Sequence, residues 1–314
     1  MGKKVLAVGD VNIDIVLSGL TAIPRSEQEV LAQDMRTVVG GQTGTFARAL
    51  RSLGVEVTFV GKVGDDEYGR QAVEQLRKDG VDVSAVIVDP EVRTGVTVVL
   101  STGPERAFAT YLGAISGLSR ADVRPELLEG ADHIHVGSYY LQRTLRPGLA
   151  DLFQEAKGLG LTTSLDPGWD PSNEWGPDML EVLKTVDIFL PNEVEAMAVT
   201  RSETPKEALE VLGEYGDIVV IKAGAKGCLA KSKEELVPCA AFQVRVVDVT
   251  SAGDVFNAGF IYGSWSGWDL KRATRFANAC GAIAVSGVGS SGIVSGVEEV
   301  ESFLACRFQQ VALD

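Results

Sequence analysis

The segment Asp248-Val-Thr-Ser-Ala-Gly-Asp-Val-Phe-Asn-Ala-Gly-Phe260 gives the strongest structural signal in the sequence. It follows an apolar run at 242–247 that is typical of a strand, and its small residues lead into a helical pattern. The first amides of a helix have no partners inside the helix, and the helix dipole places partial positive charge there. The segment therefore predicts an anion site at the start of a helix, able to hold the charge that develops on a phosphoryl group in transfer.

The start of this helix holds four candidates for catalysis, Ser251, Ala252, Gly253 and Asp254. Ala252 and Gly253 are small enough to let a phosphate approach the backbone closely. Asp254 falls in the first turn, where it can accept the proton of an attacking hydroxyl as a general base. Phosphoryl transfer depends mostly on positioning and electrostatics, so one carboxylate is chemically sufficient. The alternative interpretation is that Ser251 and Asp254 only cap the helix.

Around this segment, short apolar runs alternate with longer helical patterns over most of the chain. We predict strands at 4–8, 57–60, 85–88, 133–136, 162–166, 188–190 and 218–221. We predict helices at 43–53, 68–78, 147–157, 178–183, 193–199, 205–212, 252–264 and 270–285. Runs that are apolar on both faces and separated by helices indicate a parallel sheet covered on both sides. The predicted fold class is therefore α/β, with a doubly wound, mainly parallel sheet flanked by helices.

Two pairs of predicted strands interrupt this alternation, because no helix lies between their members. One pair is 13–17 with 29–39; the other is 95–101 with 106–112, joined by a Thr102-Gly-Pro-Glu105 turn that is typical of a hairpin. We expect a small sheet that projects from the core and covers a cleft. The predicted domains are a core of residues 1–12, 38–93 and 116–314, and a β lid of residues 13–37 and 94–115.

Composition excludes several classes of partner. Among the 314 residues, 45% are apolar and 23% charged, which is ordinary for a soluble globular protein. The formal net charge of −14 would repel nucleic acid and anionic membranes, and no apolar run is long enough to span a bilayer. We therefore expect a cytoplasmic protein with a small-molecule partner, no nucleic acid and no membrane. An anionic substrate would need local compensation by amides, a few cations and Mg²⁺.

Cysteine and histidine usage argues against a zinc or disulfide framework. The four cysteines show no CxxC spacing, which favours reduced structural thiols. Only two histidines are present, His133 and His135, and their alternate positions on a strand would share a face. A two-ligand metal site is conceivable there, but with no third ligand nearby ordinary strand positions are favoured.

The 248–260 segment closely resembles the second signature of the ribokinase-like (PfkB) carbohydrate kinase family, a D-x-T-G-A-G-D-x-F pattern. In that family the last Asp is the catalytic base and the preceding amides form the anion hole, which implies these roles for Asp254 and for Ala252 and Gly253. Ser251 stands where the family usually has Gly, so a backbone with positive φ would be strained at this position.

The N-terminal third carries the same resemblance. Residues 40–54, GGQTGTFARALRSLG, are similar to the first signature, a Gly-Gly turn that enters a helix. Paired glycines let a sugar hydroxyl meet the backbone directly, and the resemblance implies that Gly40 and Gly41 bind substrate. Thr45 stands where the family usually has Asn, so a sugar contact is altered at that position.

The first predicted strand ends in Gly9-Asp-Val-Asn-Ile-Asp14. Asn12 and Asp14 resemble the family residues that bind substrate hydroxyls, and a carboxylate can accept two hydroxyl protons at once, which suits a vicinal diol. By itself, Asp14 would more often be a turn residue.

Further motifs imply a nucleotide and metal side. Pro191-Asn192-Glu-Val-Glu195 resembles the family's N-x-x-E motif, which implies contacts of Asn192 with phosphate and of Glu195 with Mg²⁺ through water. The alternative is a helix start capped by Asn192, and both roles can coexist. The run 222–227, with Lys222, Gly224 and Gly227, resembles the family's glycine-containing turn beside ATP.

Three more positions complete this side. Asn278 matches a position usually near adenine, and Asp248 and Thr250 resemble backbone ligands of a monovalent cation, K⁺ in many members.

A GxGxxG match at 287–292 lacks the preceding strand of a dinucleotide-binding unit, and no P-loop pattern occurs.

Together, the resemblance implies an ATP-dependent sugar kinase with Mg²⁺ as cofactor, acting on a small carbohydrate of the 2-keto-3-deoxygluconate, fructose or ribose class. It also implies a homodimer formed through the β lid. Three alternatives stay open: a nucleoside kinase of the same family, with Phe108 or Tyr111 stacking on a base; a kinase of vitamin B6-type alcohols or hydroxymethylpyrimidines; and a non-catalytic sugar- or nucleotide-binding regulator. A phosphorylated sugar would need extra cations near the lid, for which Arg93 and Arg106 are the candidates.

Overall fold

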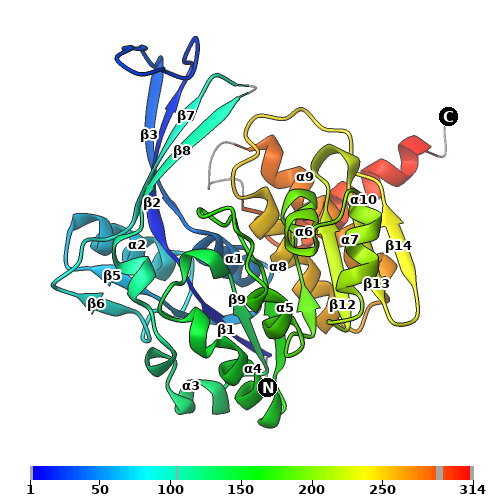
Figure 1. Cartoon of the computed structure of the whole chain (residues 1–314). Coiled ribbons are helices and arrows are strands. Elements are labelled where there is room, and N and C mark those ends of the chain that lie inside the picture. The colour runs from blue at the N-terminus through cyan, green and yellow to red at the C-terminus, as the bar shows by residue number, and fades with distance from the viewer. Residues whose placement is uncertain (1–2, 104, 288–292, 312–314) are drawn as a thin grey trace.

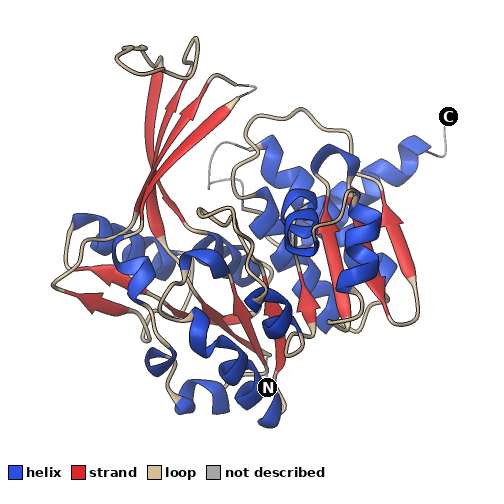
Figure 2. Cartoon of the chain, viewed as in Figure 1, coloured by secondary structure: helices blue, strands red, loops and turns tan. Residues whose placement is uncertain are grey.

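The computed structural model describes residues 3–103, 105–287 and 293–311 (Figure 1). Within them, eight strands form one large sheet in the order β14-β13-β12-β11-β10-β9-β1-β4. The strands from β12 to β4 pair in parallel, and β13 and β14 add an antiparallel edge. Helices lie on both faces of this sheet (Figure 2). The predicted α/β class with a mainly parallel sheet is therefore confirmed.

The strands of the large sheet are β1 (Lys4–Val8), β4 (Glu56–Val60), β9 (His133–Val136), β10 (Thr162–Leu165), β11 (Ile188–Phe189), β12 (Ile218–Lys222), β13 (Cys228–Ser232) and β14 (Leu236–Cys239). The α-helices are α1 (Gln42–Ser52), α2 (Glu67–Lys78), α3 (Pro125–Glu129), α4 (Leu149–Gly158), α5 (Asp178–Leu183), α6 (Glu193–Thr200), α7 (Pro205–Leu212), α8 (Ala252–Trp265), α9 (Leu270–Ser286) and α10 (Val297–Val311). Short 3₁₀ helices span Gly113–Gly117, Arg120–Asp122, Tyr139–Leu141, Arg146–Gly148 and Gly224–Lys226. In the described part of the chain, no helix has the length and apolar character that crossing a bilayer requires.

The buried core divides into two apolar clusters, one on each face of the large sheet. Along β1, Val5 and Ala7 belong to one cluster and Leu6 and Val8 to the other, because successive side chains of a strand point to opposite faces. Residues of α1, α2, α8, α9 and α10 join the first cluster, and residues of α3, α4, α5, α6 and α7 join the second. The apolar runs of the sequence are thus explained by strands that are covered on both sides.

A separate four-stranded sheet, here called the lid sheet, projects from the core (Figure 1). It comprises β2 (Asn12–Ser18), β3 (Asp34–Gly40), β7 (Val96–Ser101) and β8 (Arg106–Tyr111) in the order β3-β2-β7-β8. Strands β7 and β8 form the antiparallel hairpin that the sequence predicts, and Thr102 N donates to Glu105 O at 3.1 Å in its turn. The small sheet expected from the two interruptions of the helix–strand alternation is therefore present.

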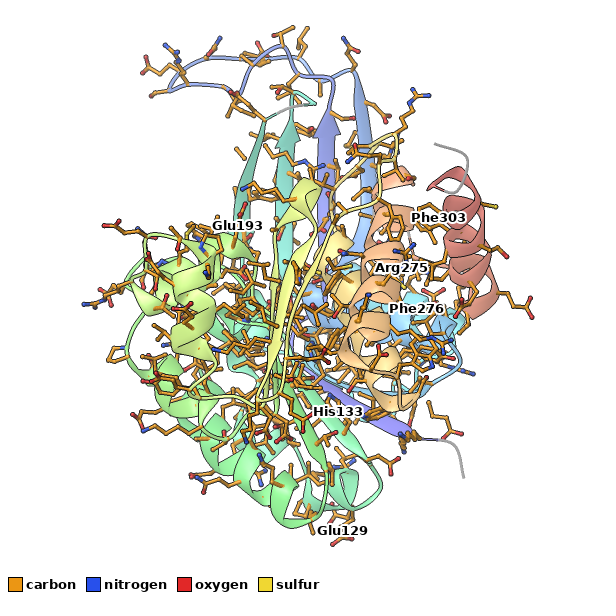
Figure 3. The ribbon with its side chains drawn as sticks, turned by 90° about the vertical axis from the view of Figure 1, so that its right-hand side faces the viewer. Glu129, His133, Glu193, Arg275, Phe276 and Phe303 are labelled. Carbon is orange, nitrogen blue, oxygen red and sulfur yellow. The ribbon has the colours of Figure 1, made fainter. Side chains whose placement is uncertain are left out.

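The prediction of a strand at 242–247 is wrong. These residues form no strand; Phe242 instead packs against Phe303 of α10 with ring centroids 5.2 Å apart, and the Arg275 guanidinium of α9 lies 5.3 Å from its ring. Figure 3 shows Arg275 and Phe303 on this side of the molecule. Val246 and Val247 are exposed, so the apolar run has no neighbouring strand to pair with and crosses the surface as a loop.

Smaller differences concern the edges of the fold. The strand predicted at 85–88 is β6 (Ile87–Asp89), which lies outside the large sheet and pairs with β5 (Lys62–Gly64). The lid strand predicted at 29–39 is β3, which begins only at Asp34, and β13, β14 and α10 were not predicted. The GxGxxG match falls mainly on 288–292, outside the described residues.

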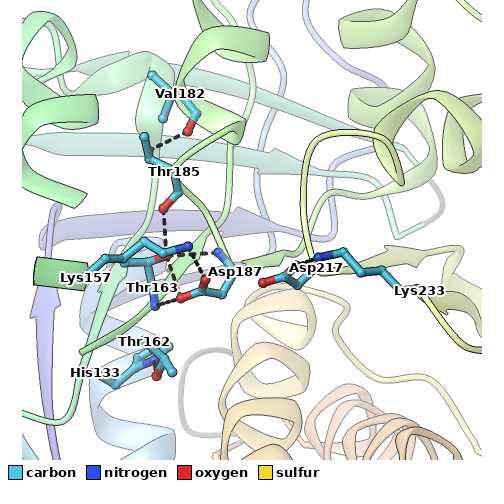
Figure 4. Close-up of polar contacts among 9 residues, drawn as sticks. All are labelled: His133, Lys157, Thr162, Thr163, Val182, Thr185, Asp187, Asp217 and Lys233. Carbon is cyan, nitrogen blue, oxygen red and sulfur yellow. Dashed lines mark hydrogen bonds and ion pairs between the residues drawn. The ribbon is translucent and has the colours of Figure 1, made fainter. Parts of the chain in front are cut away.

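Polar contacts near the amino ends of the parallel strands connect neighbouring strands to each other and to a covering helix (Figure 4). Thr163 donates through its backbone amide to Asp187 at 2.8 Å and through its hydroxyl to Thr185 O at 3.0 Å, and Lys157 pairs with Asp187. His133 Nδ1 lies 2.7 Å from the Thr162 hydroxyl. Burial lowers the pKa of both His133 and His135, to about 3 for His135, so these side chains are neutral strand residues at neutral pH.

Candidate active site

Polar side chains collect at the carboxyl ends of the parallel strands, the edge at which open α/β sheets bind ligands. Asp10 follows β1, Asp166 follows β10, Asn192 follows β11, and Lys222 ends β12. Because neighbouring parallel strands end at the same edge, these residues from distant parts of the sequence converge with the first turn of α8.

The start of α8 has the form of an anion hole. Ser251 adopts a left-handed backbone with φ +63° and makes no side-chain capping bond, so the interpretation of Ser251 as a plain side-chain cap is wrong. Among the described residues, the Gly253 amide has no acceptor, and the Ala252 amide reaches Val249 O only at 3.4 Å. The helix therefore begins with donors that a bound anion can accept from.

Asp254 lies beside these amides with 8% of its surface exposed. Burial raises the pKa of its carboxyl well above the usual value, Asp166 adds to that rise, and Lys222 opposes it. No hydrogen bond to its carboxylate occurs within the described residues, so Asp254 does not cap α8 either. A buried carboxylate with a raised pKa is a stronger base than an ordinary aspartate.

Lys222 holds a buried polar cluster beside this helix start. Its ammonium donates to Asp166 Oδ2 at 2.6 Å and to Asn257 Oδ1 at 3.2 Å, while Asn257 Nδ2 donates to the same Asp166 oxygen at 2.6 Å. Burial alone would lower the pKa of Lys222, but Asp166 and Glu195 outweigh burial and raise it, so the lysine is charged. A Cβ built on Gly253 would lie 3.6 Å from Lys222 Nζ, which places this cation directly behind the anion hole.

Asn192 and Glu195 form a reciprocal capping box at the start of α6. Asn192 N donates to Glu195 Oε2 at 2.8 Å, and Glu195 N donates to Asn192 Oδ1 at 2.9 Å. The capping interpretation of this motif is therefore correct, and it fixes Glu195 as a buried carboxylate facing the cluster. Burial, with a further contribution from Asp166, raises the pKa of Glu195 to about 7.

The predicted substrate residues Asn12 and Asp14 meet at the base of the lid sheet. Asn12 Nδ2 donates to Asp14 Oδ1 and to Thr97 Oγ1, both at 2.8 Å. The Asn12 carbonyl oxygen is buried without a partner among the described residues, and so is the hydroxyl of Thr45 on α1. Buried polar atoms are nearly always hydrogen-bonded, so two such atoms at one predicted site are suited to the hydroxyls of a ligand.

Gly40 and Gly41 are required by the close packing at this point. A Cβ on Gly40 would lie 2.2 Å from Asp14 Oδ2, and Gly41, with φ +92°, would place one 2.8 Å from Asp10 O. Asp10 in turn accepts from the backbone amide of Thr43 at 3.1 Å, so it anchors the start of α1 from the end of β1.

The predicted nucleotide residues gather on the other side of Lys222. Gly224 has φ +54°, and Gly227, with φ +96°, would place a Cβ 2.0 Å from Cys239 O. Asn278 of α9 donates to the same Cys239 O at 3.2 Å. The turn at 224–227 and Asn278 therefore meet at the end of β14, as their predicted roles around one nucleotide require.

Asp248 and Thr250 lie in the loop before α8 and are bound by the lid sheet. Arg106 Nη2 donates to Asp248 Oδ1 and Arg106 Nη1 donates to Thr250 Oγ1, both at 2.7 Å. Thr250 also donates to Asp248 Oδ1 through its amide and its hydroxyl. Although burial acts in the opposite direction, these bonds lower the pKa of Asp248, which is charged. The monovalent-cation site at Asp248 and Thr250 stays a prediction.

The charge of Asp10 acts both on the predicted substrate residue Asp14 and on the predicted base Asp254. It contributes to the raised pKa values of both Asp14 and Asp254, after the larger effect of burial. Such coupling requires Asp14 and Asp254 each to lie near Asp10. The arrangement can therefore hold a hydroxylated ligand between Asp14 and Asp254, and an anion at the start of α8.

Sequence reasoning missed three residues of this cluster. Asp10 follows a correctly predicted strand and Asp166 ends another, predicted at 162–166, so their position at the carboxyl end was a usable signal. Asn257 stands inside the 248–260 segment but has no distinctive spacing of its own. Two surface pockets, of about 440 and about 430 Å³, lie beside Arg146 and Arg93. Apart from Arg93, the candidate cation for a phosphorylated sugar, none of the predicted site residues lines either pocket.

The buried carboxyl of Asp14 predicts a pH-dependent stability. Burial raises its pKa from 3.8 to about 6, so the folded state holds this proton more tightly than the unfolded state does. The stabilisation is complete below pH 3.8 and is lost as the pH rises towards 6, by about 3 kcal/mol for a shift of this size. Urea unfolding between pH 4 and 7 should show this loss relative to Asp14→Asn, and Asp151→Asn, at an exposed position, should leave the wild-type profile unchanged. Parallel curves for the wild type and Asp14→Asn would contradict the prediction.

Comparisons with known proteins bear on the family and on the fold of the chain. The model of the pfkB family carbohydrate kinase matches residues 2–295. An ATP-dependent ribose-1-phosphate kinase of Halopiger xanaduensis is 30% identical over 309 residues, covering 97% of this chain and 99% of that protein. A ribokinase of Bacillus subtilis is 28% identical over 307 residues, covering 96% and 100%.

Solved structures extend the comparison to the fold. A protein provisionally named Ribokinase II from E. coli, in complex with ATP and Mg²⁺, has a TM-score of 0.86 at 27% identity, covering 97% of this chain and 99% of its own. A ribokinase from Thermotoga maritima has a TM-score of 0.82 at 26% identity, covering 97% and 100%. The fold described above is thus shared over nearly the whole length of both.

Proposed function

Because the chain belongs to the pfkB family of carbohydrate kinases and is an ATP-dependent carbohydrate kinase, we propose that it phosphorylates a hydroxyl of a small sugar with Asp254 as the general base. The observation that carries this proposal is the start of α8. A left-handed Ser251, an unpartnered Gly253 amide and a buried carboxylate of raised pKa lie within four residues of one another. The acceptor hydroxyl would give its proton to Asp254, while the amides of 252–254 stabilise the charge on the transferred group.

ATP would lie along the edge formed by Lys222, Gly224, Gly227 and Asn278. The ammonium of Lys222 is already held behind the anion hole, so it adds positive charge where phosphate groups would collect. The left-handed turn at Gly224 keeps side chains away from the approaching nucleotide.

The carboxylates of Glu195 and Asp166 fit a Mg²⁺ ion that keeps most of its water. In the described residues, no group of three or more His, Cys, Asp or Glu side chains forms a metal cage, so phosphate and water would supply the other ligands. Burial and Asp166 raise the pKa of Glu195 although Lys222 lowers it, so Lys222 offsets only part of the negative charge that these carboxylates bring together. When bound, Mg²⁺ supplies positive charge that neutralises the phosphate oxygens.

We propose an unphosphorylated acceptor of the 2-keto-3-deoxygluconate, fructose or ribose class. A phosphorylated sugar such as ribose 1-phosphate, which appears in the name of one relative, would need free cations near the lid sheet. Arg106 is engaged by Asp248, and the charge of Arg93 acts on Asp66. Both candidate cations therefore face carboxylates of the protein.

One observation favours a nucleoside as the second candidate acceptor. Residues 106, 108 and 110 share a face of β8, and Thr110 contacts Thr97, which binds Asn12. Phe108 is 62% exposed on this face, so its ring could stack on a base above the substrate residues. Tyr111 belongs to the opposite face and is not suited to this role.

The experiment that tests the function is a coupled assay of ADP formation with Mg²⁺ATP and a panel of acceptors. The panel contains ribose, fructose, 2-keto-3-deoxygluconate, ribose 1-phosphate, adenosine and pyridoxal, each in K⁺ and in Na⁺ buffer. We expect turnover with one unphosphorylated sugar, and product analysis by mass spectrometry should show one added phosphate. Turnover only with pyridoxal, or sugar binding without turnover, would overturn the proposal, and a K⁺ requirement would support the monovalent-cation prediction.

The lid sheet also supports the predicted homodimer. Leu17 lies opposite both Met35 and Leu100, and Leu100 lies opposite Ala107, so one face of the sheet is apolar. Met35 is 63% exposed there, and burying one such side chain is worth about 1.5–3 kcal/mol. A second copy of this chain is the partner that we propose for this face.

Sedimentation velocity tests this interface directly. We expect the wild type to sediment as a dimer and the double variant Leu17→Glu/Met35→Glu as a monomer, because two charges would be buried at the contact. Arg36→Ala, on the opposite face of the sheet, is the control and should remain dimeric. A monomeric wild type, or a dimeric double variant, would exclude this interface.

A further inference from the structure

Arg106 joins the lid sheet to the loop of residues 248–251, here called the anion-hole loop. It is separated from Asp248 by 142 residues and is the first residue of β8. Its two terminal nitrogens bind two different side chains of the loop, Asp248 and Thr250, each at 2.7 Å. The side chains of Arg106 and Asp248 are only 18% and 17% exposed, so the ion pair is largely shielded from solvent.

The contact reaches the site through a short chain of bonds. Asp248 Oδ1 accepts from Arg106 and also from the amide and hydroxyl of Thr250, which closes a tight turn. The next residue, Ser251, has φ +63°, a left-handed conformation that is strained for a residue other than glycine. Such a strained backbone persists only where neighbouring groups hold it in place. The two bonds from the Arg106 guanidinium to Asp248 and Thr250 can hold the turn in this way.

The same lid strands reach the substrate residues at their other end. Thr110 of β8 lies 3.1 Å from Thr97 of β7, and Thr97 accepts from Asn12, which donates to Asp14. The β7–β8 hairpin thus contacts the predicted acceptor site at its base and the anion-hole loop near its tip.

Charge gives a second reason for the contact. Asp248 is a carboxylate four residues before Ala252, whose amide is the first of the helical amides that would receive phosphate. An uncompensated negative charge there would repel the anion. The guanidinium of Arg106 compensates this charge from the lid sheet.

We propose that Arg106 is a positioning residue for the phosphoryl transfer: by holding Asp248 and Thr250 it keeps the anion-hole loop in the left-handed turn that aims the amides of 252–254. The inference rests on the proposed function of this site. Arg106 acts through the loop and does not itself touch the reacting groups in this arrangement.

The test compares Arg106→Ala, Arg106→Lys and Arg36→Ala. Arg36 is a matched lid arginine that pairs with Asp34 on β3, at the edge of the lid sheet opposite β8. We expect Arg106→Ala to lower kcat by ~10- to ~100-fold, the scale of a misplaced catalytic group, with a smaller change in KM for ATP. Arg106→Lys should recover only part of the loss, because an ammonium cannot bind both partners as the planar fork does. Added guanidinium ion should restore activity to Arg106→Ala and leave Arg36→Ala unchanged.

A readout that does not depend on turnover separates this inference from the proposed function. In hydrogen exchange by mass spectrometry, Arg106→Ala should accelerate exchange of the amides at 249–255, while Arg36→Ala should match the wild type. Asp248→Asn should give a similar kinetic loss, and the double variant with Arg106→Ala should lose no more than the more affected single variant.

Each outcome bears on one of the two claims. If the wild type shows no kinase turnover, the proposed function is wrong. Faster hydrogen exchange at 249–255 in Arg106→Ala would still support the positioning role. Unchanged exchange and kcat in Arg106→Ala would overturn the inference, as would additive losses with Asp248→Asn. A loss confined to KM for ATP would do the same, since it would make Arg106 a direct nucleotide ligand.

Discussion

Replacing Asp254 by Asn is expected to lower kcat by at least about a thousandfold, while the affinity for ATP stays close to that of the wild type. The amide keeps the size of the carboxylate but cannot accept the proton of the acceptor hydroxyl. Because Asp254 makes no capping bond to α8, the substitution removes no support from the helix. Initial rates under saturating substrates, together with ATP titration calorimetry, measure the two effects separately.

A matched control comes from α9, a helix that is preceded by a side-chain N-cap. Asp269 accepts from Arg272 N at 2.7 Å at the start of α9, so Asp269→Asn tests what a change at a helix start does by itself. We expect it to leave kcat almost unchanged. Equal loss of ATP binding and turnover in Asp254→Asn would count against a base and in favour of a structural role.

Replacing Lys222 by Met should have the largest effect on stability. The substitution leaves Asp166, 1% exposed as a side chain, without its cation, and it leaves Glu195 and Asp254 without the charge that opposes their repulsion. Removing one partner of a buried ion pair typically lowers the free energy of unfolding by about 3–5 kcal/mol. Urea unfolding at pH 7 should therefore show a loss of this order.

Lys226 provides the control, because it is a lysine in the same turn whose pair with Glu193 is exposed. Lys226→Met should change the free energy of unfolding by less than about 1 kcal/mol. The double variant Lys222→Met/Asp166→Asn should recover part of the lost stability, since it removes the unpaired carboxylate. If Lys222→Met unfolds at the same urea concentration as Lys226→Met, the buried cluster is not what stabilises this edge.

The sequence was sufficient to predict the layers of the fold and the start of α8. The parallel strands are buried on both faces, so their apolar runs are visible without any partner, and the 248–260 segment combines small residues with a carboxylate in one short stretch. The run at 242–247 has the same composition as a strand, yet it has no neighbour, because pairing depends on which strands the tertiary structure brings alongside. The β13–β14 edge was missed because its two short strands include lysine and proline.

The polar cluster was harder to predict because its members are distant in sequence. An aspartate after a strand, as at Asp166, has the same local pattern as a turn residue, and only Lys222 and Asn257 give it a distinct environment. Arg106 was weighed as a cation for a phosphosugar, and no local pattern could have indicated a carboxylate 142 residues away as its partner. Motifs show which residues are special, whereas the ion pairs that constrain them depend on the tertiary fold.

The lid sheet contributes little to the apolar interior. Of the buried residues that make up the two described core clusters, the lid strands supply Ile13 and Val39, both next to the junction with the large sheet. The chain enters and leaves this sheet close to Asn12, Gly40, Val96 and Tyr111, where strands end. The tip could therefore be exchanged for that of a relative with a different preference, provided that the arginine at 106 is retained. Acceptor choice could then diverge among descendants while the interior of the protein stays the same.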